Sequence, residues 1–141
     1  MNYSSTVDVP ASTEIVRPFV EDLASYPRWM PMVHNVSAVA SDVWSVELRA
    51  KVGVFARSKM LRMRRTMNEE KIIVFERDED DGRQHSPWVM RVSINPSAAG
   101  TNVTIDLSYG GSLWTAGILD RVLASQVDAG KAGLVRVVQG A

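Results

Sequence analysis

The chain has 141 residues with 16 basic and 16 acidic side chains, so its formal net charge is zero. This length predicts one domain spanning residues 1–141, because two separate domains would each be close to the lower size limit for burying a core. Zero net charge provides no overall attraction to nucleic acid, so no nucleic-acid partner is predicted. The chain contains no cysteine, which excludes disulfides, thiolate metal ligands and cysteine nucleophiles.

The first eight residues lack the basic start and the apolar run that are typical of a secretory signal. A run of about 18 consecutive apolar residues, as a spanning helix needs, occurs nowhere in the sequence, so no integral membrane segment is expected. We therefore expect a cytoplasmic protein that is a monomer or a homodimer.

The N-terminal part predicts a strand followed by helical structure. Weak alternation over residues 3–9 ends at a proline and predicts a short strand. Capping side chains then precede apolar residues at helical spacing, which predicts an amphipathic helix ending near Ser25. The proline-rich segment 26–31 predicts a brief helical turn that directs Trp29 and Met30 inward.

From Val33 to Gly110 the apolar period changes to two, which predicts a run of antiparallel strands. The clearest strand is Val43 to Val52, where apolar and polar residues alternate throughout. Further strands are expected at 55–67, 71–77, 88–96 and 103–109, with a solvated acidic turn at 78–82. Short connections between them favour a meander over crossovers.

The last helix-like stretch, Leu113 to Val138, has an apolar stripe with a glycine in it. A glycine inside a helix costs about 1 kcal/mol relative to alanine, so the position has to serve some other need. Two interpretations remain open for Gly130. It leaves room above the sheet for a ligand, together with Gly133, or it lets the helix approach Trp44 or Trp88 closely.

Three segments of the chain, taken in order, resemble the START-like, or Bet v 1-like, superfamily and its bacterial polyketide cyclase/dehydrase-like branch. The segments are VDVPAS leading into IVRPFV at 7–20, YPRWMP at 26–31 and GTNVT at 100–104. The resemblance implies an α+β helix-grip fold, in which a curved antiparallel sheet of six to seven strands wraps round a long C-terminal helix. Two short helices would follow the first strand.

Members of this superfamily bind lipids, polyketides, quinones or other apolar molecules between helix and sheet, so the resemblance implies a hydrophobic small-molecule ligand. The candidate ligand-binding residues are Trp29, Trp44, Leu48, Met60, Trp88, Met90, Tyr109, Leu123 and Gly130. Methionine adapts to irregular apolar guests, and a tyrosine hydroxyl can orient them. The alternative for the same apolar stripes is a filled core, in a protein-interaction or chaperone-type module such as some relatives form.

The sequence shows no set of residues typical of a strong catalytic centre. His34 and His85 are the only histidines and have no metal-ligand spacing, so neither a metal site nor a cofactor is predicted. A carrier and a metal-free cyclase or dehydratase both remain compatible with the residues. The basic run 57–65 predicts a solvated face paired with acidic residues, and the alternative is that Arg62 or Arg64 binds a carboxylate or phosphate inside the cleft.

Overall fold

The computed structural model describes the backbone of residues 2–52, 54–110 and 116–140, and the side chains of these residues other than 52, 55 and 116–123. The strands are β1 (Asn2–Val9), β2 (Val33–Ala40), β3 (Val43–Val52), β4 (Phe55–Asn68), β5 (Ile72–Arg77), β6 (Trp88–Ser97) and β7 (Gly100–Tyr109). The helices are α1 (Thr13–Val20), the 3-10 helix η1 (Leu23–Arg28) and α2 (Ala116–Gln139). This order confirms the predicted helix-grip arrangement.

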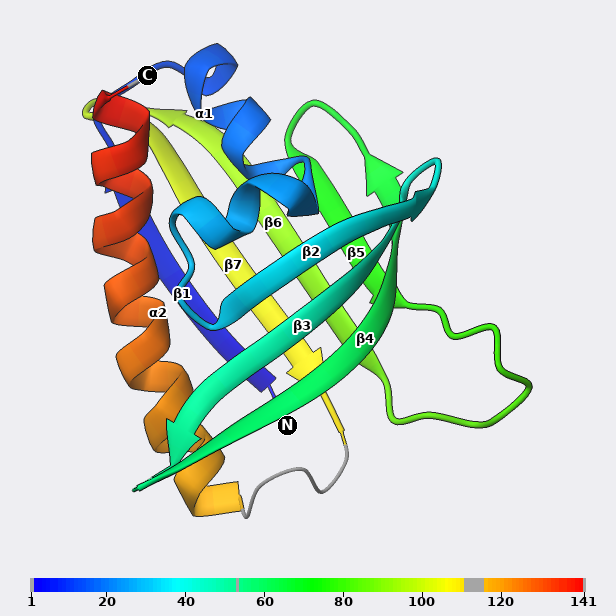
Figure 1. Ribbon diagram of the computed structural model, residues 1–141. Helices are drawn as coiled ribbons and strands as arrows, with labels where there is room; N and C mark the ends of the chain where they lie inside the picture. Colours follow the sequence, from blue (N-terminus) through cyan, green and yellow to red (C-terminus); the bar gives the residue numbers. More distant parts are fainter. Residues whose placement is uncertain (1, 53, 111–115, 141) are drawn as a thin grey trace.

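The strands form one antiparallel sheet in the order β1-β7-β6-β5-β4-β3-β2. Strands β2 to β7 follow one another as a meander, and β1 joins the far edge by pairing with β7. The sheet curves strongly, with α2 running along its open side (Figure 1). Helix α2 contacts both β1 and β3, which lie toward opposite edges of the sheet, so it bridges the open side.

Two aromatic side chains tie the 3-10 helix to α1. The hydroxyl of Tyr26 donates a hydrogen bond to the carbonyl oxygen of Val20 at 2.9 Å. The indole N–H of Trp29 donates to the carbonyl oxygen of Phe19, also at 2.9 Å. Both rings are buried, and the predicted inward direction of Trp29 is confirmed. These bonds satisfy carbonyl groups at the end of α1 that its helical pattern leaves without partners.

Strand alternation divides the sheet into a buried concave face and a convex face. On β3 the concave residues are Trp44, Val46, Leu48 and Ala50, as the sequence pattern predicts. On β4 the concave face includes Leu61 and Met63, because they lie opposite Val46 and Trp44. The register of β4 therefore determines which part of its mixed apolar and basic sequence faces the core.

Candidate functional site

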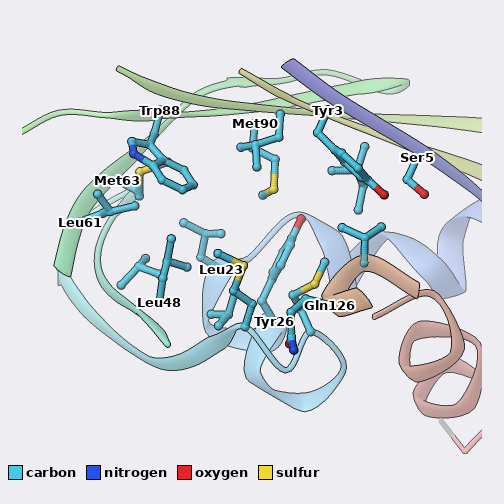
Figure 2. Close-up of a pocket in the computed structure, with 17 residues that line it drawn as sticks. Tyr3, Ser5, Leu23, Tyr26, Leu48, Leu61, Met63, Trp88, Met90 and Gln126 are labelled. Carbon is cyan, nitrogen blue, oxygen red and sulfur yellow. The ribbon is translucent and has the colours of Figure 1, made fainter. Parts of the chain in front are cut away.

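A cavity of about 100 Å³ lies between the concave face of the sheet and the 3-10 helix (Figure 2). The sheet contributes Tyr3, Ser5, Val33, Val46, Leu48, Leu61, Met63, Trp88, Met90, Ile105 and Leu107. The 3-10 helix and the segment after it contribute Leu23, Tyr26, Met30 and Met32, and α2 contributes Gln126 and Val127. As far as its residues are described, the wall contains no ionisable side chain except the two tyrosines, so it suits an apolar guest.

The two ends of the cavity are lined by different residues. Trp88, Met63 and Leu61 gather at one end, whereas Tyr3 and Ser5 come from β1 at the other (Figure 2). Aromatic, thioether and aliphatic groups at the first end can adapt to an apolar guest of irregular shape. The second end is lined by carbon atoms of a tyrosine and a serine, since the surface of the cavity is apolar throughout.

Two buried polar groups belong to the residues of the wall. The hydroxyl of Tyr26 already donates to Val20, and burial raises the pKa of this phenol. The group is therefore held as a neutral hydroxyl whose oxygen can still accept a hydrogen bond. The indole N–H of Trp88 is buried without a hydrogen-bond partner among the described residues. An unpaired buried donor of this kind costs about 1–3 kcal/mol.

The structure places only some of the predicted site residues in the cavity wall. Leu48, Trp88 and Met90 line it. Tyr109 is buried and stacks on Trp88 with ring centroids 5.2 Å apart, but it lies outside the wall. Trp44 packs edge-on against Phe75 at 5.8 Å and also belongs to the core. Tyr109 and Trp44 therefore fill the core, as the alternative interpretation of the apolar stripes expects.

Two further predicted ligand-binding residues are Trp29 and Leu123. Trp29 is 3% exposed and lies beneath α2, outside the cavity wall, where it borders a void of only about 10 Å³. Its role in the structure is to anchor the 3-10 helix to Phe19. The side chain of Leu123 lies outside the described residues, so its predicted contact with a ligand stays a prediction.

The placement of Met60 on the concave face was wrong. Met60 lies opposite Glu47 on β3, and its exposed fraction is 57%. Successive strand residues point to opposite faces, so Leu61 takes the inward position and Met60 points outward. The sequence around Met60 is ambiguous because apolar and basic residues occur at both alternating positions of β4.

Gly130 and Gly133 of α2 do not hold open the cavity. A Cβ atom added at Gly130 would lie 2.8 Å from the sulfur of Met30, and one at Gly133 would lie 2.3 Å from the carbonyl oxygen of Trp29. The prediction that Gly130 makes the binding space was therefore wrong. The alternative, that Gly130 allows close approach of the helix, is correct. The helix approaches the segment after the 3-10 helix, however, and not Trp44 or Trp88.

Several residues of the wall were missed by the sequence pattern. Val46 could have been found, because it shares the alternating face of Leu48. Leu61 and Met63 needed the register of β4, which also has an irregularity between Arg65 and Met67. The missed residues of the wall in the N-terminal strand and helical segment are Tyr3, Ser5, Leu23, Tyr26, Met30, Met32 and Val33. The remaining ones are Ile105, Leu107, Gln126 and Val127.

The basic run on β4 is divided between the two faces. Arg64 pairs with Asp78 at 2.7 Å, and Arg62 lies within 3.8 Å of Asp78 and 3.7 Å of Asp80. Both arginines thus occupy the face paired with acidic residues, and the alternative that one of them enters the cleft was wrong. Arg65, on the concave side, donates to Asp42 at 2.5 Å and lies over the ring of Trp44.

The loop before β6 is held by a chain of charged contacts. Arg77 pairs with Glu79 at 2.6 Å and donates to the carbonyl oxygen of Ser86 at 3.2 Å. A second guanidinium nitrogen lies 3.1 Å from Nδ1 of His85, whose Nε2 lies 2.8 Å from Asp81. His85 thus has a structural role beside the acidic turn, at the end of the sheet where β6 begins.

Acid should weaken this loop through two exposed carboxylates. The hydrogen bond from Arg64 lowers the pKa of Asp78, and the backbone N–H of Arg83 followed by His85 lowers the pKa of Asp81. Stability from such groups is present above the unfolded pKa, near 3.8, and is lost as pH falls through the lower folded value. Urea unfolding between pH 5 and pH 2 should show a decline in stability that is shallower in a D78N/D81N variant. An equally steep decline in that variant would contradict the assignment.

Within the described ranges, no three histidine or acidic side chains gather as metal ligands. None of the helices, as far as their residues are described, is both long and apolar enough to cross a bilayer.

Comparison with known proteins agrees with the architecture. The family model described as polyketide cyclase / dehydrase and lipid transport matches residues 1–139. No significant match was found among curated proteins. A START superfamily protein from Mycobacterium smegmatis is 19% identical with a TM-score of 0.74, over 99% of this chain and 97% of that one.

Two other solved structures share the fold at lower identity. A conserved protein from Geobacillus kaustophilus is 11% identical with a TM-score of 0.78, covering 99% of this chain and 96% of its own. The Zhui aromatase/cyclase from Streptomyces sp. R1128 is 15% identical with a TM-score of 0.66, covering 99% and 93%. The chain therefore belongs to the polyketide cyclase/dehydrase and lipid transport family and has the helix-grip fold of START-like proteins.

Proposed function

We propose that the protein binds an apolar or amphipathic small molecule, of lipid, polyketide or quinone type, in the cavity between the concave face and the 3-10 helix. The observation that carries the proposal is the apolar cavity of about 100 Å³ in a chain of this family. Apolar walls with few polar atoms are typical of small-molecule sites. Association with a hydrophobic guest would remove the apolar wall from water.

The composition of the wall favours binding over acid–base catalysis. Among the residues whose side chains the structure describes, the cavity wall includes no carboxylate, histidine, lysine or arginine. The phenol of Tyr26 is engaged with Val20, and its raised pKa makes it a poor proton donor or base near neutral pH. Cyclase or dehydratase chemistry is the second candidate, supported by the family and by the aromatase/cyclase of similar fold.

Retention of a guest is the direct test. Native mass spectrometry of the purified chain, followed by solvent extraction, should reveal a bound apolar molecule, and Nile red should bind and be displaced by added lipid. A protein with no retained guest that also fails to bind Nile red would contradict the proposal. If the protein converts an added linear polyketide into a cyclised product, that result would favour cyclase chemistry as its function.

Filling the cavity should abolish binding. Met90→Trp adds an indole to a half-buried position in the wall, and we expect Nile red affinity to fall by about tenfold or more, which is 1.4 kcal/mol. The matched control is Arg91→Trp, because the next residue of β6 is exposed on the other face. Fluorescence titration measures both variants. Unchanged affinity in Met90→Trp, with native circular dichroism, would place the dye elsewhere.

A further inference from the structure

Lys59 lies on the concave face of β4, next to residues of the cavity wall. The register of β3 and β4 places it directly opposite Leu48, and Leu61 follows two residues later on the same face. Both leucines line the cavity. Directly opposed residues on one face have Cβ atoms about 4.5–5.5 Å apart. The Cβ atom of Lys59 is therefore beside the apolar wall.

The ammonium group of Lys59 forms no ion pair with a carboxylate of the described residues. Lys59 is half-buried and makes no hydrogen bond or ion pair with any residue that the structure describes. The nearby carboxylate of Glu79 is engaged by Arg77 at 2.6 Å, with side chains 17% and 8% exposed. Burial, followed by the charge of Arg77, lowers the pKa of Lys59. A bound anion would relieve both effects by favouring the charged lysine.

The surrounding hairpin is strongly basic although the whole chain is neutral. Residues 49–59 include four basic side chains and no acidic one. Arg57 lies opposite Ala50, on the same face as Lys59 and closer to the end of the hairpin. Arg49 and Lys51 alternate with the concave residues and belong to the other face, so Arg57 and Lys59 provide the positive charge on the concave side of the hairpin.

Trp88 belongs to the same end of the cavity, but its indole nitrogen does not face the cavity surface. Trp88 is 5% exposed, and its indole N–H has no partner among the described residues. Figure 2 shows Trp88 beside Met63 and Leu61, the end of the cavity from which β4 continues to Lys59. The ammonium group of Lys59 is a charged donor, so a ligand oxygen that accepts hydrogen bonds and carries negative charge complements it.

We propose that the cavity selects amphipathic ligands with an oxyanion head group, a carboxylate or a phosphate, placed at Lys59 with the hydrocarbon part in the apolar cavity. This inference rests on the proposed binding function and adds the class of head group. Lysine contributes a point charge on a flexible stem, which suits either oxyanion. The proposal also defines the orientation of the bound ligand, because its head group lies toward the 49–59 hairpin.

Three probes with the same ten-carbon chain test the head group. Sodium decanoate, decyl phosphate and 1-decanol are titrated into the full chain preloaded with Nile red. At least one of the two anions should bind about tenfold more tightly than 1-decanol, since a hydrogen bond to a charged group contributes about 1.5–3 kcal/mol. The tighter of the two anions identifies the head group as carboxylate or phosphate.

Two lysine variants test whether Lys59 causes the preference for the anionic probes over 1-decanol. Lys59→Gln should bring the anions to the affinity of 1-decanol and leave 1-decanol itself unchanged, whereas Lys51→Gln, exposed on the same hairpin, should keep the preference. Equal affinity of all three probes for the original chain, or a preference that survives Lys59→Gln, would overturn the inference. Failure of 1-decanol and both anions to bind would instead contradict the proposed function itself.

Discussion

Gly133→Ala should lower the free energy of unfolding by about 3 kcal/mol. The new Cβ atom would lie 2.3 Å from the carbonyl oxygen of Trp29 and 3.1 Å from its carbonyl carbon. Both are backbone atoms, so relief requires α2 or the segment after the 3-10 helix to move, and overpacking of this kind costs about 1–3 kcal/mol or more. The loss should exceed the gain of about 1 kcal/mol that alanine brings to a helix.

Two other glycines of α2 and its end provide matched controls. Gly140→Ala meets nothing closer than 3.7 Å and should change stability by about 0.5 kcal/mol or less. Gly130→Ala meets the flexible end of Met30 at 2.8 Å, which can move, so its cost should be intermediate. Urea denaturation of the three variants measures the order. Equal stability of the Gly133 and Gly140 variants would contradict the close approach of α2 to Trp29.

Met30 connects this packing to the cavity. It contacts the position of Gly130 and also lines the cavity. A side chain added at Gly130 therefore displaces Met30 and changes the shape of the wall. Reduced Nile red affinity in Gly130→Ala would reflect that displacement and not a side chain entering an empty space below the helix.

Phe75→Ala should destabilise the protein by about 3–5 kcal/mol, the cost typical of removing a large buried aromatic side chain. Phe75 is fully buried and meets the rings of Tyr26 and Trp44 edge-on at 6.1 Å and 5.8 Å. The substitution removes packing between the sheet and the 3-10 helix and leaves a cavity that the rigid surroundings cannot close. Thermal and chemical unfolding measure the loss.

The control for this prediction is an exposed residue of another strand. Val39 on β2 is 53% exposed, and Val39→Ala should change stability by about 0.5 kcal/mol or less. Phe75→Leu retains more volume and should be less damaging than Phe75→Ala. A similar small effect for Phe75→Ala and Val39→Ala would show that Phe75 does not organise the core.

Much of the fold was predictable because its signals are local. Alternation over Val43–Val52 and helical spacing in the last segment are properties of neighbouring residues, and both elements occur as expected. The resemblance of the ordered motifs supplied the helix-grip topology, which the family model supports. The wall residues on β3 and β6 followed from alternation alone, as Leu48, Trp88 and Met90 illustrate.

The remaining part of the site depended on contacts between distant segments. Met60 and Met63 are both methionines of one strand, and only pairing with β3 shows that Met63 faces the cavity. Most of the cover comes from the 3-10 helix and the segment after it, which the sequence suggested only through the inward direction of Trp29 and Met30. Whether the space beside Gly130 is open or filled likewise depends on a distant residue, Met30, which packs there.

By itself, the sequence determined the order of the elements and an apolar face on the strands, since these follow from local period, and the resemblance of its motifs implied the helix-grip fold. The tertiary structure decided that Leu61 faces inward and Met60 outward, and that Met30 occupies the space beside Gly130. Strand register and helix packing join residues far apart in the chain, and a shift of one residue exchanges the two faces of a strand. For that reason only the folded chain shows that Lys59 lies opposite Leu48 of the cavity wall.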